Sequence, residues 1–231
     1  MKRQRVLVVE DEASMRDVYR RFFDTMLREE FEADIVPDAE QALVALREAP
    51  IDLMVLDWNL PGISGVNLAK ALRTDPKTQA MGILMVTGKT TLGEEIVALD
   101  SGADDHLAKP FDEKILQARL RSLSRRRDNS LSRDQSTRFP GLDLDWETGR
   151  LNIDGRPVHL TPKEAELLRI FLHRPHVLHS HMYLWQALWG YDSDQWDHIL
   201  VTTVSQLRKK LGPKWSERLN THVGKGYSFD T

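Results

Sequence analysis

Leu53-Met54-Val55-Leu56-Asp57 is an unbroken apolar run that ends on a carboxylate. Two other apolar runs end on polar groups in the same way: Val6–Val9 before Glu10 and Asp11, and Ile83–Val86 before Thr87. Apolar strands separated by helical stretches are typical of a parallel sheet buried on both faces, whose carboxyl strand ends share one crevice. We therefore expect three carboxylates and a hydroxyl to meet there.

Helical patterns alternate with these runs. Apolar residues recur at helical spacing in five segments, which begin near Ser14, Ala39, Val66, Leu92 and Asp112. Ser14 and Asp17 have the spacing of a capping box, and a short strand, His106–Ala108, precedes Lys109. This order predicts a five-fold βα alternation, which is a doubly wound α/β fold with a five-stranded parallel sheet.

Length and composition bound the class of protein. The chain has 231 residues with 41% hydrophobic content, which suits two modest globular domains. No stretch approaches the roughly 20 apolar residues of a membrane span, so we expect a cytoplasmic protein without membrane contact. The absence of cysteine excludes disulfides, thiolate metal sites and cysteine nucleophiles.

The formal charge of −3 hides an asymmetry along the chain. Residues 1–124 carry 16 basic and 22 acidic side chains, whereas residues 125–138 carry five basic and two acidic ones, beginning with Arg125-Arg126-Arg127. Five of six tryptophans and seven of eight histidines follow residue 138. We therefore expect a first domain over 1–124, a polar linker over 125–138 and a second domain over 139–231.

The expected cluster has a defined chemistry. An aspartate at a strand end can act as a nucleophile toward phosphorus if its charged surroundings are neutralised. Mg2+ prefers oxygen ligands, so Asp11 and Asp57 can bind it directly and Glu10 through water. Lys109 would then pair with a phosphoryl oxygen, and Thr87 offers a hydroxyl donor. The plainer alternative is that these are solvated residues above a sheet, but their common order favours a site.

Residues 4–124 resemble the receiver domain of bacterial two-component response regulators. The resemblance is carried by motifs in family order: Val8-Val9-Glu10-Asp11-Glu12, Asp57-Trp58-Asn59-Leu60-Pro61-Gly62, Thr87-Gly88, Gly102-Ala103-Asp104-Asp105 and Lys109-Pro110-Phe111. It implies a flavodoxin-like receiver fold, transfer of a phosphoryl group to Asp57 from a sensor histidine kinase, and a switch through Thr87. It also implies Mg2+ held by Asp11, Asp57 and the Asn59 carbonyl.

Three positions bear on how such a switch works. In receiver domains the residues at Asn59 and Lys89 help to set the lifetime of the phosphoryl group. His106 stands where the family commonly has Tyr or Phe, a ring that moves inward with the threonine. An imidazole is smaller and titrates near neutrality, so coupling here is expected to be weaker or pH-sensitive; a plain surface position is the alternative.

The sequence of the second domain predicts a winged helix. Thr161-Pro162-Lys163-Glu164 predicts a helix start, with Thr as N-cap, Pro in the first turn and Glu three residues after the cap. Candidate strands precede it, helical patterns follow near residues 182–189 and 197–211, and a hairpin around Gly224-Lys225-Gly226 closes the chain. Three helices flanked by hairpins predict a smaller α+β winged-helix domain.

The third helix of this domain has one apolar face and one polar face. We expect Thr202, Ser205, Gln206 and Lys209 to reach base edges in a major groove, and Arg208 and Lys210 to meet phosphates. Lys225 at the hairpin tip is expected to reach an adjacent minor groove. The alternative is that Arg208-Lys209-Lys210 is only a solvated helix end.

Residues 139–229 resemble the effector domain of OmpR/PhoB-type regulators. The matching motifs are Leu160-Thr161-Pro162-Lys163-Glu164, Glu166-Leu167-Leu168, Leu188-Trp189-Gly190, Leu207-Arg208-Lys209-Lys210-Leu211 and Gly224-Lys225-Gly226-Tyr227. Val201, Thr203, Gln206 and Val223 depart from the family's charged residues. Fewer cations predict a complex with double-stranded promoter DNA that is weaker and less salt-dependent, or that relies more on dimerisation.

The resemblance implies a transcription regulator that becomes a homodimer when it is phosphorylated, and not a conventional enzyme. On the dimer face, Asp104 or Asp105 with Arg119 matches the family's charge pairs, whereas Glu95 and Ile115 do not form the second pair. The main alternative is a constitutive DNA-binding regulator whose first domain is a dimerisation scaffold. A phosphohydrolase acting through Asp57 is a third hypothesis. The kinase, the operator and the sign of regulation stay open.

Overall fold

The computed structural model describes residues 3–88, 101–124, 136–139, 141–145, 150–190 and 196–230. The chain divides into two compact units, residues 1–125 and residues 126–231.

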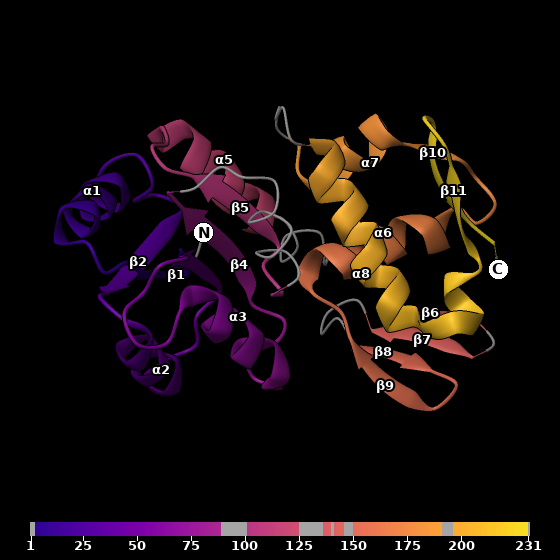
Figure 1. Ribbon diagram of the computed structural model, residues 1–231, viewed down its shortest axis with the longest axis horizontal. Coiled ribbons are helices and arrows are strands. Elements are labelled where there is room, and N and C mark those ends of the chain that lie inside the picture. Colours follow the sequence, from indigo (N-terminus) through magenta and orange to yellow (C-terminus); the bar gives the residue numbers. More distant parts are fainter. Residues whose placement is uncertain are drawn as a thin grey trace. The chain divides into compact units, whose positions relative to one another are not determined.

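In the described part of the first unit, five parallel strands alternate with helices (Figure 1). The strands are β1 (Gln4–Val9), β2 (Phe31–Val36), β3 (Leu53–Asp57), β4 (Gly82–Thr87) and β5 (Asp105–Ala108), in the sheet order β2-β1-β3-β4-β5. The helices are α1 (Ala13–Asp24), α2 (Ala39–Glu48), α3 (Gly65–Thr74) and α5 (Glu113–Ser124). The predicted doubly wound sheet is confirmed. The predicted helix near residues 92–100 lies outside the described residues.

Each face of this sheet has its own core. Alternate residues of a strand point to opposite faces, so Leu7 and Val9 of β1 pack with α2 and α3, whereas Val6 and Val8 pack with α1 and α5. Strands β3 and β4 divide their apolar side chains between the two cores in the same way. The central strands are buried on both faces, which explains their continuous apolar sequences.

The first helix begins one residue before the predicted start. Helix α1 starts at Ala13 with Glu12 in the N-cap position, and no side chain caps its amides. The Ser14 hydroxyl donates instead to the Glu12 carboxylate. The capping box predicted from Ser14 and Asp17 is therefore wrong, because Ser14 already lies inside the first turn.

Among its described residues, the second unit combines two small antiparallel sheets with three helices. One sheet joins β6 (Ser136–Phe139), β7 (Leu142–Asp145), β8 (Arg150–Ile153) and β9 (Arg156–His159), so β6 includes the last three residues of the expected linker. The other sheet has the order β10-β12-β11, from β10 (His179–Ser180), β11 (Leu219–His222) and β12 (Gly226–Phe229). The helices are α6 (Pro162–His173), α7 (His181–Leu188) and α8 (Trp196–Ser216).

This arrangement is the predicted winged helix, with β11 and β12 as the terminal hairpin. Thr161 caps α6 in a full capping box with Glu164, as its sequence predicted. Helix α8 contains a break at Gly212, whose φ of 74° is left-handed, so its regular part ends near the predicted Leu211. Its buried side chains include Leu200, Val204, Leu207 and Leu211, the predicted apolar face.

Candidate phosphorylation and DNA-binding sites

Strand alternation carries three charged side chains to one face of the sheet. Val8 and Val55 belong to the core beneath α1 and α5, and so does Leu107 of β5. Glu10, Asp57 and Lys109 each lie two residues after one of these three side chains, so they point to the same face of the sheet. The carboxyl edge of the sheet therefore directs these side chains toward α1 and α5.

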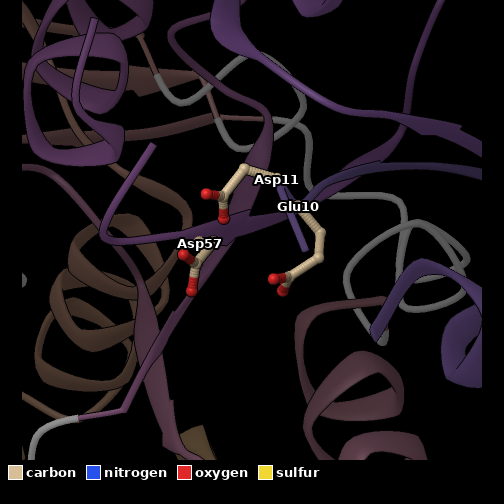
Figure 2. Close-up of side chains that lie close together, drawn as sticks. All are labelled: Glu10, Asp11 and Asp57. Carbon is tan, nitrogen blue, oxygen red and sulfur yellow. The ribbon is translucent and has the colours of Figure 1, made fainter. Parts of the chain in front are cut away.

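The three predicted carboxylates do meet. Ligand oxygens of Glu10, Asp11 and Asp57 lie within 4.8 Å of one another, and Figure 2 shows the side chains converging. Glu10 is 1% exposed and Asp57 is 5% exposed, whereas Asp11 is exposed to solvent. Three acidic oxygens at such spacing fit the preference of Mg2+ for oxygen ligands.

Lys109 supplies the positive charge. Its ammonium donates to both oxygens of Glu10, at 2.9 and 2.7 Å, and lies 3.0 Å from Asp57 Oδ1. Burial by itself would lower the pKa of Lys109, but the hydrogen bonds and charges of Glu10 and Asp57 outweigh burial and raise this pKa. Lys109 is therefore a fixed cation at neutral pH.

The same surroundings act differently on Glu10. Burial raises the pKa of Glu10, the charge of Asp57 raises it further, and the hydrogen bond from Lys109 only partly offsets these effects. The cluster thus holds more negative charge than its single ammonium compensates. A divalent cation or another positive group would relieve that excess.

Backbone contacts fix the positions of the acidic residues. Arg16 of α1 donates to the carbonyl oxygens of Glu10, at 3.0 Å, and Asp11, at 2.6 Å. The backbone amide of Asn59 donates to Asp57 Oδ2 at 3.2 Å. Gly65 packs so closely on the Asp57 carbonyl that an added Cβ would lie 2.0 Å from that oxygen. The loop after β3 therefore needs glycine at the start of α3.

Thr87 and His106 belong to the opposite face of the sheet. Ile83 and Met85 of β4 pack in the core of α2 and α3, and alternation places Thr87 on that face. His106 pairs with Met85 across β4 and β5, and both Thr87 and His106 are 2% exposed. His106 is thus a buried residue and not a surface strand position. Lys89 lies outside the described residues.

The residues predicted for a dimer face make ion pairs inside the chain. Arg119 of α5 donates to Asp105 Oδ1 at 2.7 Å, and both side chains are buried. Asp104 pairs with Arg73 of α3 at 2.7 Å and also accepts from the amide of Ile83. Arg73 was missed by sequence reasoning, because nothing in its spacing relates it to Asp104. Glu95 lies outside the described residues, and Ile115 is exposed.

Helix α8, which was predicted to read DNA, exposes some of the side chains that were expected to contact bases. Ser205 and Lys209 are exposed on α8, Thr202 and Gln206 are half-buried beside them, and Lys225 is exposed at the turn between β11 and β12. Val201, which was not expected to take part, is 52% exposed on the same face.

Two predicted phosphate-binding cations have partners within the domain. Arg208 donates to the Leu219 carbonyl at 2.6 Å and to the Thr221 hydroxyl at 2.7 Å, so it ties α8 to strand β11. Lys210 donates to the Glu164 carboxylate at 2.5 Å and thereby ties α8 to the start of α6. Both side chains hold the winged helix together, in addition to any role at DNA.

Comparisons with known proteins match both units. Residues 6–121 match the response regulator receiver domain, and residues 155–229 match the family described as transcriptional regulatory protein, C terminal. The chain is 32% identical over 228 residues to the phosphate regulon transcriptional regulatory protein PhoB of Rhizobium meliloti, covering 98% of this chain and 99% of that protein. It is 34% identical over 210 residues to the DNA-binding response regulator MtrA of Mycobacterium tuberculosis, covering 90% and 88%.

Solved structures share the fold along the whole chain. A mutant of RitR has a TM-score of 0.77 at 24% identity and covers 98% of this chain and 99% of its own. The Thermotoga maritima OmpR/PhoB homolog DrrB has a TM-score of 0.51 at 21% identity, with 100% of each chain covered. Among the described helices, none is both long and apolar enough to cross a bilayer.

Proposed function

The chain belongs to the OmpR/PhoB family of two-component response regulators, and we propose that phosphorylation of Asp57 controls its binding to promoter DNA. The observation that carries this proposal is the nearly buried Asp57 carboxylate, 3.0 Å from the ammonium of Lys109 and among two further carboxylates. A buried acid with an adjacent fixed cation is suited to accept a phosphoryl group, whose charge the cation then stabilises.

The phosphoryl donor proposed is the phosphohistidine of a sensor kinase. One Asp57 oxygen forms a bond to phosphorus while the P–N bond breaks, and its electron pair returns to the imidazole, which takes up a proton. Lys109 pairs with a phosphoryl oxygen as a point charge. Thr87, at the end of the neighbouring strand, is proposed as the hydroxyl donor of the switch, with His106 beside it on the same face.

The acidic cluster fits a magnesium ion by the chemistry of its donors. Asp11, Asp57 and the carbonyl of Asn59 would hold the ion, and Glu10 would act through water. When bound, Mg2+ supplies positive charge that offsets the phosphoryl oxygens. The excess negative charge around Glu10 supports this assignment.

DNA binding is proposed for the exposed face of α8 and for Lys225. Thr202, Ser205, Gln206 and Lys209 would face base edges, because they lie on the outward side of α8 and an α-helix fits a major groove. Arg208 and Lys210 would reach phosphates only by giving up or sharing their bonds to β11 and α6. A dimer formed on phosphorylation would place two such domains on repeated half-sites.

Incubation with Mg2+ and acetyl phosphate, followed by intact mass measurement, tests the proposal. The wild type should gain the mass of one phosphoryl group, and Asp57→Asn should gain none. Beryllofluoride should then increase the wild type's dimer fraction and its promoter occupancy. If the wild type gains no mass, yet binds DNA as a dimer in every condition, the constitutive scaffold hypothesis replaces this one.

A further inference from the structure

Tyr19 of α1 is a fully buried tyrosine whose hydroxyl has no hydrogen-bond partner among the described residues. Its ring packs in the core with Val8 and Val55 and lies 5.9 Å from the ring of Phe111, centroid to centroid. Buried hydroxyls are normally hydrogen-bonded, because removing them from water without a partner is unfavourable. Phenylalanine would fill the same space without that cost.

The hydroxyl lies on the side of the sheet to which Glu10, Asp57 and Lys109 are directed. Burial raises the pKa of Tyr19 well above its ordinary value, and the charges of Glu10 and Asp57 raise it further. Tyr19 is thus a neutral phenol within electrostatic reach of both carboxylates, and its O–H can serve them only as a donor. Helix α1 is also held to the acidic loop through Arg16, one turn before Tyr19.

Glu10 depends on Lys109 in the unphosphorylated protein. Both of its oxygens accept from that ammonium, and Glu10 is 1% exposed, which leaves little access to water. When a phosphoryl group on Asp57 attracts Lys109, Glu10 loses the hydrogen bonds from that ammonium and keeps the one from the Glu12 backbone amide, and bulk water has little access to replace the lost donors. A buried carboxylate that loses a charged donor is destabilised unless another donor takes its place.

We propose that Tyr19 is a positioning residue of the phosphorylated state: its hydroxyl donates to Glu10 when Lys109 turns to the phosphoryl group. This inference rests on the proposed function of Asp57. It explains why the core retains a hydroxyl that has no partner among the described residues, because Glu10 would lose its ammonium donor only on phosphorylation.

The variant Tyr19→Phe removes the hydroxyl and little else. Beryllofluoride with Mg2+ is the probe, and its affinity is measured by 19F NMR on the full chain. We expect Tyr19→Phe to bind it about tenfold more weakly, because a hydrogen bond to a charged group has an effect of that order. Its melting temperature without beryllofluoride should equal or exceed that of the wild type. Tyr227→Phe, a buried tyrosine in the second unit, is the matched control and should keep wild-type affinity.

A double-mutant cycle with Glu10→Gln separates the proposed contact from packing. If Tyr19 acts through Glu10, removing its hydroxyl in the Glu10→Gln background should change affinity much less than in the wild type. Equal affinity of Tyr19→Phe and wild type overturns the inference and leaves the proposed function intact. Failure of the wild type to bind beryllofluoride overturns both. If Tyr19→Phe melts lower, Tyr19→Met is measured beside it, and recovery of affinity without the hydroxyl again overturns the inference.

Discussion

Lys109 is bonded more fully to Glu10 than to Asp57. Its ammonium donates to both Glu10 oxygens, whereas it reaches a single oxygen of Asp57 at 3.0 Å. The site is therefore an ion pair between Lys109 and Glu10 with Asp57, the proposed phosphoacceptor, alongside. Phosphorylation of Asp57 would change how Lys109 divides its contacts between Glu10 and Asp57. Because Glu10 is buried in this pair, its ionisation should contribute to the free energy of unfolding.

The substitution Glu10→Gln should remove a pH-dependent loss of stability. The pKa of Glu10 is raised above its ordinary value of 4.5, so the folded state binds this proton more tightly than the unfolded chain. The resulting stabilisation is fully present below pH 4.5 and is lost as the pH rises through the raised pKa. Glu10→Gln should therefore gain in unfolding free energy over the wild type as the pH rises above 4.5.

Urea denaturation between pH 4 and pH 7.5, with EDTA present, measures this difference. The exposed Glu217→Gln is the control and should follow the wild-type pH dependence. A Glu10→Gln curve that stays parallel to the wild type across the range would contradict the prediction.

The substitution Arg119→Ala should destabilise the first unit strongly. It would leave the buried Asp105 carboxylate without its 2.7 Å ion-pair partner, and breaking a buried pair costs about 3–5 kcal/mol. Arg121→Ala on the same helix is the control, because its pair with Glu30 is exposed and such pairs are worth about 0.2–1 kcal/mol. Both are measured by urea unfolding. If Arg119→Ala unfolds like the wild type and loses only dimerisation, Arg119 acts between chains instead.

Two glycines near the phosphoacceptor should respond differently to alanine. A Cβ at Gly65 would lie 2.0 Å from the Asp57 carbonyl oxygen, so the loop must shift, and such overpacking costs about 1–3 kcal/mol. A Cβ at Gly88 would meet no atom of the residues that the structure describes within 4 Å. Gly88→Ala should unfold like the wild type but accept a phosphoryl group more slowly, because Gly88 follows Thr87 at the strand end, where the backbone is proposed to approach the phosphoryl group closely. Thermal unfolding and mass-based phosphorylation rates separate the two.

The sequence was sufficient to predict the central strands and the cluster of Glu10, Asp11 and Asp57. Strands β1, β3 and β4 are buried on both faces, so their apolar runs are continuous and their ends are marked by Glu10, Asp57 and Thr87. Strand β2 was not located, because it is an edge strand with mixed exposure and an irregular pattern.

Partners of individual side chains could not be predicted from spacing. Arg73 meets Asp104 only because α3 and the end of the loop before β5 are adjacent in the fold. The sequence indicates that Arg208 and Lys210 are phosphate-binding cations. In the structure they also donate hydrogen bonds to β11 and α6, which are distant in sequence. Periodicity determines which face of a helix is polar, whereas the partner depends on how separate elements pack.

Neighbouring cations on α8 should therefore have different effects when replaced. Lys209 is exposed, so Lys209→Ala should leave the unfolding free energy within about 0.5 kcal/mol of wild type. Because Lys209 is proposed to face base edges, the substitution should weaken binding to the specific site by about 1–3 kcal/mol and reduce its preference over random duplex DNA. Arg208→Ala should also destabilise the domain by about 0.5–1.5 kcal/mol, because the Leu219 carbonyl and Thr221 hydroxyl lose a part-buried and an exposed hydrogen bond. Fluorescence anisotropy on the specific site and on random duplex DNA, together with urea unfolding, measures both quantities. If Arg208→Ala is as stable as Lys209→Ala, the bonds to β11 contribute nothing to stability and Arg208 serves DNA alone.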